Sequence, residues 1–222
     1  HSLGEWSALV ASGALGLGDA VRLVGGRGRL MQAAVPEGEG VMLAVLGLPP
    51  SDIERICAEA ASATEAVFAP ANYNAPEQTV ISGHARAAGL AKEKLAAAGA
   101  KKVVTLPVSA PFHCPLMEPA AAGLAKALEP VALRAPAAPV IANVDAAPHD
   151  DPGQLTANLI RQVTAPVRWV EVVERVVREG ETLALELGSG KVLAGLARRI
   201  DRSLRVLPVG DPASLEKALE AL

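Results

Sequence analysis

Residues 40–108 carry six consecutive element patterns in the order βαββαβ, and few folds accommodate that order. Short apolar runs predict strands at 41–46, 66–71, 78–82 and 102–108, and Ala-rich amphipathic segments predict helices at 50–63 and 84–98. Residues 72–76, Asn-Tyr-Asn-Ala-Pro, are typical of a turn between the second and third strands. Because βαββαβ is the ferredoxin-like order, we expect a ferredoxin-like subdomain at 40–108.

The flanking segments, residues 1–39 and 109–222, follow a different pattern. Apolar periodicity predicts helices at 2–15, 19–35, 116–128 and 155–179, the last with a break at Pro166. A short strand is expected at 140–144, and the continuous apolar runs at 183–187 and 204–209 are typical of strands buried in a parallel sheet. Each of these two runs precedes a further helical segment. We therefore expect one α/β body built from both flanking segments, with the ferredoxin-like subdomain inserted into it.

Composition argues against two kinds of partner. Aromatic residues make up only 2% of the chain, which leaves few rings for stacking on bases, and the net charge of −3 provides no overall positive field. The longest apolar runs are of strand length, well short of the roughly 20 residues that span a bilayer. Cys57 and Cys114 lack metal-ligand spacing and are expected to be buried, reduced thiols. We expect a cytoplasmic protein that binds neither nucleic acid nor membranes.

The first four residues, His1-Ser2-Leu3-Gly4, match the last four positions of the nucleophile elbow G-x-S-x-G. In such an elbow the serine lies on a tight strand-to-helix turn, where the helix N-terminus faces developing negative charge. The first glycine and the strand that leads into it are not in the sequence, so the N-terminal strands of the body are expected to be missing. Taken alone, the short motif favours a simpler interpretation, in which Ser2 only caps the helix.

Further segments, together with His1-Ser2-Leu3-Gly4, resemble the malonyl-CoA:acyl carrier protein transacylases of fatty-acid synthesis. The resemblance rests on the order and spacing of short motifs over the whole chain. They are Val-Gly-Gly-Arg-Gly-Arg-Leu-Met-Gln at 24–32, Ala-Val-Pro-Glu-Gly at 34–38, Asn-Tyr-Asn-Ala-Pro-Glu-Gln at 72–78, Val-Ile-Ser-Gly at 80–83, Pro-Val-Ser-Ala-Pro-Phe-His-Cys at 107–114, Arg-Gln at 161–162, Pro-Val-Arg-Trp at 166–169 and Glu-Leu-Gly-Ser-Gly-Lys-Val-Leu at 186–193. The resemblance implies a hydrolase-like parallel-sheet body at 1–39 and 109–222 with the ferredoxin-like subdomain at 40–108.

Carried onto the matching positions, the resemblance makes Ser2 the nucleophile and His113 its general base. A serine hydroxyl needs an imidazole to take its proton, and the same imidazole then protonates the leaving thiolate. The family holds this imidazole with a backbone carbonyl, whose source here is expected at Gln162. The backbone N–H of Leu3, directly after the nucleophile, is expected to bind the oxyanion. On their own, His113 would fit a packed core histidine and Gln162 an exposed helical residue.

The resemblance also implies the substrate. The family binds the free carboxylate of the malonyl group with the arginine matching Arg27, because a guanidinium offers two parallel N–H donors. Phe112 resembles the malonyl-selective signature of polyketide synthase acyltransferases, and His1 is expected beside the substrate. The simpler alternatives are a solvated helix arginine and a core aromatic. The implied reaction is ping-pong, from malonyl-CoA to Ser2 and then to the phosphopantetheine thiol of acyl carrier protein, with no cofactor and no metal ion.

Acyl carrier proteins are acidic, so a basic docking surface is expected. The densest basic cluster comprises Lys191, Arg198, Arg199, Arg202 and Arg205, although a solvated helix face explains these charges equally well. The protein is expected to be a monomer. In the family a second oxyanion donor comes from a loop before the position of residue 1, which implies a C-terminal portion with little transfer activity on its own.

Three rival functions remain open at this point. A serine esterase or thioesterase of the α/β-hydrolase type would use the chain order Ser, acid, His, which Asp145 and His149 could supply. An inactive fragment that only binds carrier protein would keep the surface without a working elbow. A polyketide synthase acyltransferase domain would share the chemistry of the favoured family.

Overall fold

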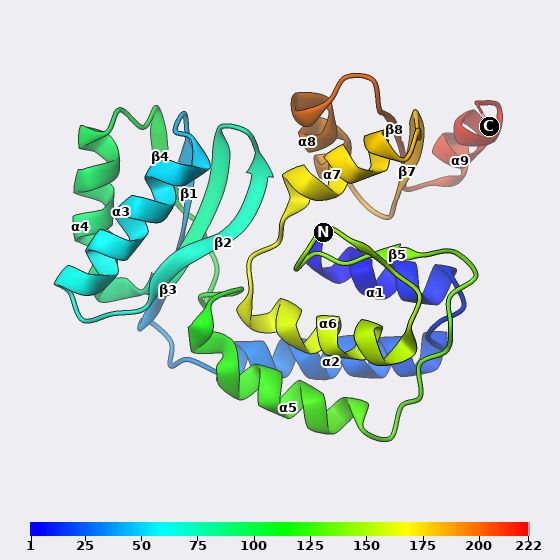
Figure 1. Cartoon of the computed structure of the whole chain (residues 1–222), viewed down its shortest axis with the longest axis horizontal. Helices are drawn as coiled ribbons and strands as arrows, with labels where there is room; N and C mark the ends of the chain where they lie inside the picture. The colour runs from blue at the N-terminus through cyan, green and yellow to red at the C-terminus, as the bar shows by residue number, and fades with distance from the viewer. Residues whose placement is uncertain (222) are drawn as a thin grey trace.

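The computed structural model describes residues 1–221, in which helices and strands alternate over most of the chain. In Figure 1 a four-stranded sheet with two helices occupies one end of the molecule, and helices α1, α2, α5 and α6 occupy the other. The elements from α7 to α9 lie along α1. The chain is therefore an α/β protein. Within residues 1–221, no helix combines the length and the apolarity needed to cross a bilayer.

The four-stranded sheet is antiparallel, in the order β2-β3-β1-β4. Its strands are β1 (Gly40–Leu46), β2 (Phe68–Ala75), β3 (Gln78–His84) and β4 (Lys102–Thr105), and the helices between them are α3 (Pro50–Ala63) and α4 (Ala85–Ala97). Strand side chains alternate between the two faces. Leu43 and Val45 pack with residues of α3 and α4, whereas Met42 faces the opposite side, where Phe112 lies against it. The second face of the sheet therefore meets the segment that carries Phe112.

The six elements expected at 40–108 are present in the expected order, but two of their ends differ by three residues or more. β2 continues to Ala75, so residues 72–75 lie in a strand and the turn is confined to residues 76–77. Register shifts within β2 allow this polar stretch to pair with β3. Tyr73 N–H also donates to the Val167 carbonyl at 2.9 Å, a tertiary contact that local patterns do not reveal. β4 ends at Thr105 rather than at 108.

The helical end of the molecule buries one continuous apolar core. It is formed by α1 (Ser2–Ala11), α2 (Leu17–Ala33), α5 (Glu118–Leu128) and α6 (Pro152–Thr164), whose buried side chains include Trp6, Leu9, Leu23, Leu124 and Leu159. The first helix was expected to reach residue 15, but Gly13 adopts a positive φ of 76° and the helix ends before it. α2 and α5 pack closely, since a Cβ added at Gly123 would lie 2.5 Å from Leu30 Cδ2.

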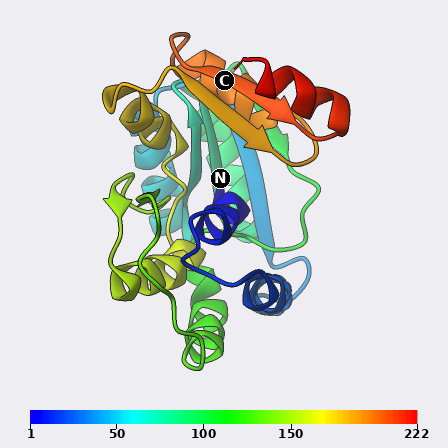
Figure 2. The same cartoon turned by 90° about the vertical axis from the view of Figure 1, so that its right-hand side faces the viewer.

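The C-terminal part contains α7 (Trp169–Arg178), β7 (Leu183–Leu187), α8 (Val192–Ile200), β8 (Arg205–Val209) and α9 (Pro212–Leu219). The break expected at Pro166 separates α6 from α7. β7 and β8 pair in parallel, and in Figure 2, where α1 and α2 are seen nearly end-on, this sheet lies above α1. Among the named strands of residues 1–221, parallel pairing is confined to these two.

Two expectations for strands outside the four-stranded sheet were wrong. The run at 183–187 is not buried, because Leu185 is 37% and Leu187 69% exposed. In the described chain β7 has a single neighbouring strand, so its apolar side chains are covered only in part. The strand expected at 140–144 shortens to β5 (Val140–Ile141), which pairs with β6 (Pro148–His149) in a small hairpin.

Candidate active site

A cavity of about 740 Å³ opens at the N-terminus of α1, between α2, the segment at 112–113 and the loop after β7. Six of the predicted site residues line it, namely His1, Ser2, Leu3, Arg27, Phe112 and His113. The seventh, Gln162, is fully buried beside Ser2. The fold thus brings together residues of α1, α2 and α6 and of the segment between β4 and α5.

Ser2 is the first residue of α1, and His1 occupies the N-cap position without a side-chain cap bond. The interpretation of Ser2 as a helix cap is therefore wrong. Its Oγ accepts a hydrogen bond from Arg27 Nη2 at 2.5 Å and donates to Gln162 Oε1 at 3.3 Å. Leu3 and Gly4 follow at the cavity wall, where the first N–H groups of a helix favour negative charge.

His113 is held in a strained backbone conformation, with φ at +61°. Its Nδ1–H donates to the Gln162 carbonyl at 2.8 Å, which leaves Nε2 with a lone pair. Burial lowers the pKa of this imidazole to about 4, although the hydrogen bond to Gln162 opposes the shift. The ring is therefore neutral near pH 7 and can accept a proton. No hydrogen bond joins His113 to Ser2 in the described residues, because the Ser2 hydroxyl is engaged by Arg27 and Gln162.

Arg27 lies on α2 and is only 9% exposed, so the solvated alternative is wrong. Its Nη2 donates to Ser2 Oγ and to Gln162 Oε1, both neutral oxygens, and its buried Nε has no partner among the described residues. Burial lowers the pKa of the guanidinium, and attraction to Glu5 opposes that shift. A buried cation without a directly bonded carboxylate leaves donors available to an anionic ligand in the cavity.

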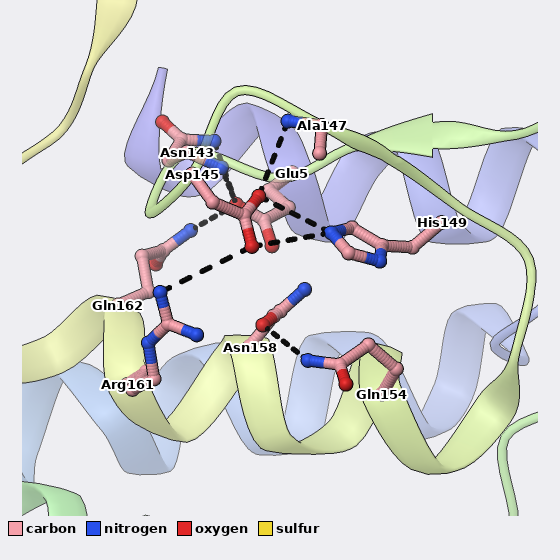
Figure 3. A network of polar contacts seen from close by, with 9 residues as sticks. All are labelled: Glu5, Asn143, Asp145, Ala147, His149, Gln154, Asn158, Arg161 and Gln162. Carbon is pink, nitrogen blue, oxygen red and sulfur yellow. Dashed lines mark hydrogen bonds and ion pairs between the residues drawn. The ribbon is translucent and has the colours of Figure 1, made fainter.

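Gln162 is fully buried, which excludes the exposed alternative. Its carbonyl holds His113 as expected, but its side chain also contacts Ser2, Arg27 and Glu5. The sequence motifs assign Glu5 no role, and its only signal is a carboxylate one helical turn after Ser2. Figure 3 shows Glu5, Gln162 and Asn143 turned toward one another.

His1 and Phe112 form part of the cavity wall. His1 Nε2 lies 2.8 Å from Asn74 Oδ1, and its ring centroid is 5.7 Å from that of Trp169. Phe112 is half-buried and packs against both the helical core and the face of the sheet that carries Met42. It therefore serves at once as a cavity wall and as a core aromatic.

The basic residues lie away from the cavity, on and after α8. Lys191 occupies the N-cap position of this helix without a side-chain cap bond, Arg198 and Arg199 are in its last turn, and all three are exposed. Lys191, Arg198, Arg202 and Arg205 line a surface hollow. Arg199 instead donates to Gln78 Oε1 on β3 at 2.7 Å, which ties the last turn of α8 to the antiparallel sheet.

The acid and histidine of the esterase alternative do meet, but elsewhere. Asp145 Oδ1 lies 3.1 Å from His149 Nε2 in the β5–β6 hairpin, and Arg161 approaches the same carboxylate at 4.0 Å (Figure 3). Neither Asp145 nor His149 lines the cavity that holds Ser2. Of the two histidines considered as the base for Ser2, His113 lines its cavity and His149 does not.

Comparison with known proteins finds similarity over nearly the whole chain. An acyl transferase domain family matches residues 1–198. The malonyl CoA-acyl carrier protein transacylase of Salmonella typhimurium is 46% identical over 219 residues, which are 99% of this chain and 70% of that protein. The acyl-carrier-protein S-malonyltransferase of Burkholderia pseudomallei 1710b gives a TM-score of 0.95 at 48% identity, covering 99% of this chain and 71% of that one. A malonyl-transacylase solved in complex with a type II PKS acyl-carrier protein gives 0.96 at 44% identity, covering 100% and 71%.

Proposed function

Because the chain belongs to the acyl transferase family and is a homologue of the acyl-carrier-protein S-malonyltransferases, we propose that it transfers a malonyl group from malonyl-CoA to acyl carrier protein in fatty-acid synthesis. The main support for malonyl as the acyl group is the burial and position of Arg27. This buried guanidinium lines the cavity beside Ser2, bonds there only to neutral oxygens and has an unpartnered Nε in the described residues. A malonyl group supplies the carboxylate that such a site lacks.

In the first half-reaction Ser2 Oγ attacks the thioester carbon of malonyl-CoA. The serine proton passes to Nε2 of His113, whose other nitrogen is fixed by the Gln162 carbonyl. The C–S bond then breaks, and the proton moves from Nε2 to the leaving thiolate, so that free coenzyme A and malonyl-Ser2 result. The second half-reaction reverses these steps with the phosphopantetheine thiol of the carrier protein as nucleophile.

Malonyl binding also frees the nucleophile. In the unliganded site Ser2 Oγ accepts the Arg27 Nη2 hydrogen bond. When the malonyl carboxylate takes the Arg27 donors in a bidentate contact, Ser2 Oγ loses its Arg27 donor, and the hydroxyl can exchange its 3.3 Å bond to Gln162 Oε1 for one to His113. Recognition of the carboxylate and activation of the serine are thus one event in this proposal. An acetyl group, which has no carboxylate, leaves Arg27 on Ser2.

The tetrahedral intermediate carries an oxyanion that needs an N–H donor. The backbone N–H of Leu3, at the start of α1 and on the cavity wall, is the donor that this chain offers. The positive end of the α1 dipole adds to its effect. Phe112 and His1 complete the wall around the acyl group and limit its size.

For the carrier protein, we assign docking to the exposed basic residues Lys191, Arg198 and Arg199 on α8. An acidic partner is attracted to such a surface, and one relative was solved together with a type II PKS acyl-carrier protein.

For the domains, we propose a hydrolase-like body at 1–39 and 109–222 and a ferredoxin-like subdomain at 40–108. The order β2-β3-β1-β4 supports the second assignment.

Intact-protein mass spectrometry after incubation with malonyl-CoA tests the proposal. We expect a mass gain of one malonyl group in the unaltered protein and none in Ser2→Ala. Addition of acyl carrier protein that bears its phosphopantetheine arm should remove the malonyl group from Ser2 and leave it on the carrier. Release of malonate to water at the same rate with and without carrier protein would instead identify a thioesterase.

A further inference from the structure

The Glu5 carboxylate lies beneath the site and bonds to neither Ser2 Oγ nor Arg27 in the described residues. It is on α1, one turn after Ser2, and is 4% exposed. Its Oε2 accepts three hydrogen bonds, from Asn143 N at 2.8 Å, Asn143 Nδ2 at 2.6 Å and Gln162 Nε2 at 2.8 Å. Figure 3 shows Asn143 and Gln162 converging on it from the β5–β6 hairpin and from α6. Three donors on one buried oxygen hold the carboxylate in place.

The Gln162 amide links Glu5 to the site and uses all of its hydrogen-bonding capacity. Nε2 donates to Glu5 Oε2 and to the Ser2 carbonyl at 3.1 Å. Oε1 accepts from Arg27 Nη2 at 3.0 Å and from Ser2 Oγ at 3.3 Å. A primary amide offers two N–H donors and two lone pairs, so every position is occupied. Each of these contacts depends on which way the amide faces.

We propose that Glu5 is a positioning residue that fixes the orientation of the Gln162 amide and thereby holds Arg27 ready for a substrate carboxylate. A carboxylate only accepts hydrogen bonds, so Gln162 must turn its NH₂ group toward Glu5 and its oxygen toward Arg27. In the opposite orientation the Gln162 oxygen would face the Glu5 oxygen, and the Gln162 N–H groups would face the N–H groups of Arg27. Neither pair can form a hydrogen bond. This inference rests on the proposed function, because it assigns Glu5 a part in selecting malonyl over acetyl groups.

Among the described residues Glu5 reaches Arg27 only through the Gln162 amide, and this indirect contact matters as much as the orientation of that amide. A carboxylate bonded directly to Arg27 would occupy the donors that the substrate needs. Glu5 instead acts through the Gln162 amide, and its negative charge favours the buried guanidinium without covering it. The site therefore contains a counter-charge for Arg27, and no carboxylate bonds to the guanidinium that lines the cavity in the described residues.

The substitution Glu5→Gln tests this role with little change in shape. The new amide can donate as well as accept, so it no longer dictates the orientation of Gln162. The matched control is Asp145→Asn, which removes a carboxylate from the neighbouring hairpin that has no bond to Gln162. Initial rates of Ser2 acylation are measured by mass spectrometry over a range of malonyl-CoA and acetyl-CoA concentrations.

We expect Glu5→Gln to lower the ratio of malonyl to acetyl loading by at least about tenfold, mainly through a higher KM for malonyl-CoA. Asp145→Asn should leave this ratio unchanged. In an Arg27→Ala background, Glu5→Gln should not lower the ratio further, because the group it positions is gone. A purely structural role for Glu5 would reduce both acyl groups equally and leave the ratio as it is; that result would overturn the proposal.

A second variant and a second readout separate a failure of this inference from a failure of the proposed function. Should circular dichroism show that Glu5→Gln does not fold, Asn143→Ala removes one of the three donors to Glu5, and the ratio should fall in the same direction by a smaller factor. An unchanged ratio in a folded Asn143→Ala then counts against the proposal. An unaltered protein that never acquires malonyl on Ser2 contradicts the proposed function itself, whereas a malonyl-selective protein with an unaffected Glu5→Gln variant contradicts only the role of Glu5.

Discussion

Two neighbouring clusters of this protein contain the same residue types, a histidine, a carboxylate and an arginine, but differ in burial. The buried cluster consists of Ser2, Glu5, Arg27, His113 and Gln162, none more than 9% exposed. The hairpin cluster consists of Asp145, His149 and Arg161, whose side chains are 28%, 18% and 54% exposed. Figure 3 shows Asp145, His149 and Arg161 close to Glu5 and Gln162.

The clusters use their polar groups in opposite ways. In the hairpin cluster the carboxylate of Asp145 lies 3.1 Å from His149 Nε2 and 4.0 Å from Arg161 Nη2, and such partly solvated pairs contribute little free energy. In the buried cluster the guanidinium of Arg27 meets only neutral oxygens and keeps an unpartnered Nε in the described residues. Similar residue types therefore do not define a site. What marks a site here is a buried cation that lines a cavity and has no carboxylate bonded to it in the described residues.

The largest contrast is expected between the two histidines. His113→Ala removes the proposed base and should slow malonylation of Ser2 by about 10²–10⁴-fold, whereas His149→Ala should change it by less than about twofold. Acylation rates from mass spectrometry measure both, with circular dichroism to verify folding. A comparable loss in the two variants would mean that the hairpin cluster takes part in the chemistry and that the comparison fails.

The two arginines give the next contrast. Arg27→Ala should lower malonyl loading by about 100-fold while acetyl loading is kept or rises, because only the malonyl group has a carboxylate to lose its partner. Arg161→Ala, on the same assay, should alter neither acyl group. Equal loading of malonyl and acetyl groups by the unaltered protein would remove the basis of this prediction.

The two carboxylates should differ in stability. Glu5→Ala leaves three buried N–H groups without their acceptor and should lower the free energy of unfolding by about 3 kcal/mol. Asp145→Ala should lower it by less than about 1 kcal/mol, since its partners are partly solvated. Urea titrations determine both values. Similar losses would show that burial does not separate the clusters.

The smallest expected change is in the pH dependence of acylation. Burial lowers the pKa of His113 to about 4, so the neutral imidazole persists well below pH 6.5. The malonylation rate at pH 5.5 should be within about twofold of that at pH 7 and should fall as the pH approaches 4. Because the unfolded state binds the His113 proton first, the stability from this group is complete above about pH 6.5 and is lost as the pH falls through about 4. A fall in the malonylation rate with its midpoint near pH 6.5 would contradict the claim that burial lowers the pKa of His113.

The sequence predicted much of the site because short motifs carry its residues. Ser2, Arg27 and His113 were placed together by resemblance, and all three line one cavity, although their chemical roles stay predictions. Glu5 and Asn143 could not be recognised, since their bond joins α1 to a hairpin far along the chain. A hydrogen bond between distant polar residues leaves no periodic pattern in either segment.

In the fold, too, the features set by local sequence were predicted and those set by distant contacts were not. The order of elements at 40–108 follows from local periodicity and was predicted correctly. β2 reaches Ala75 by pairing with β3, and the Val167 backbone bonds to both Ala71 and Tyr73, so residues that locally resemble a turn lie in paired backbone. The exposure of Leu187 likewise depends on what covers β7 rather than on its own apolar sequence.

A crystal structure of the protein with malonyl esterified to Ser2 would show which group binds the substrate carboxylate. We expect the malonyl carboxylate to accept paired hydrogen bonds from the Arg27 guanidinium, the Arg27 bond to Ser2 Oγ to be gone, and the Gln162 amide still to turn its nitrogen to Glu5. A carboxylate that points to solvent while Arg27 stays on Ser2 Oγ would contradict this expectation.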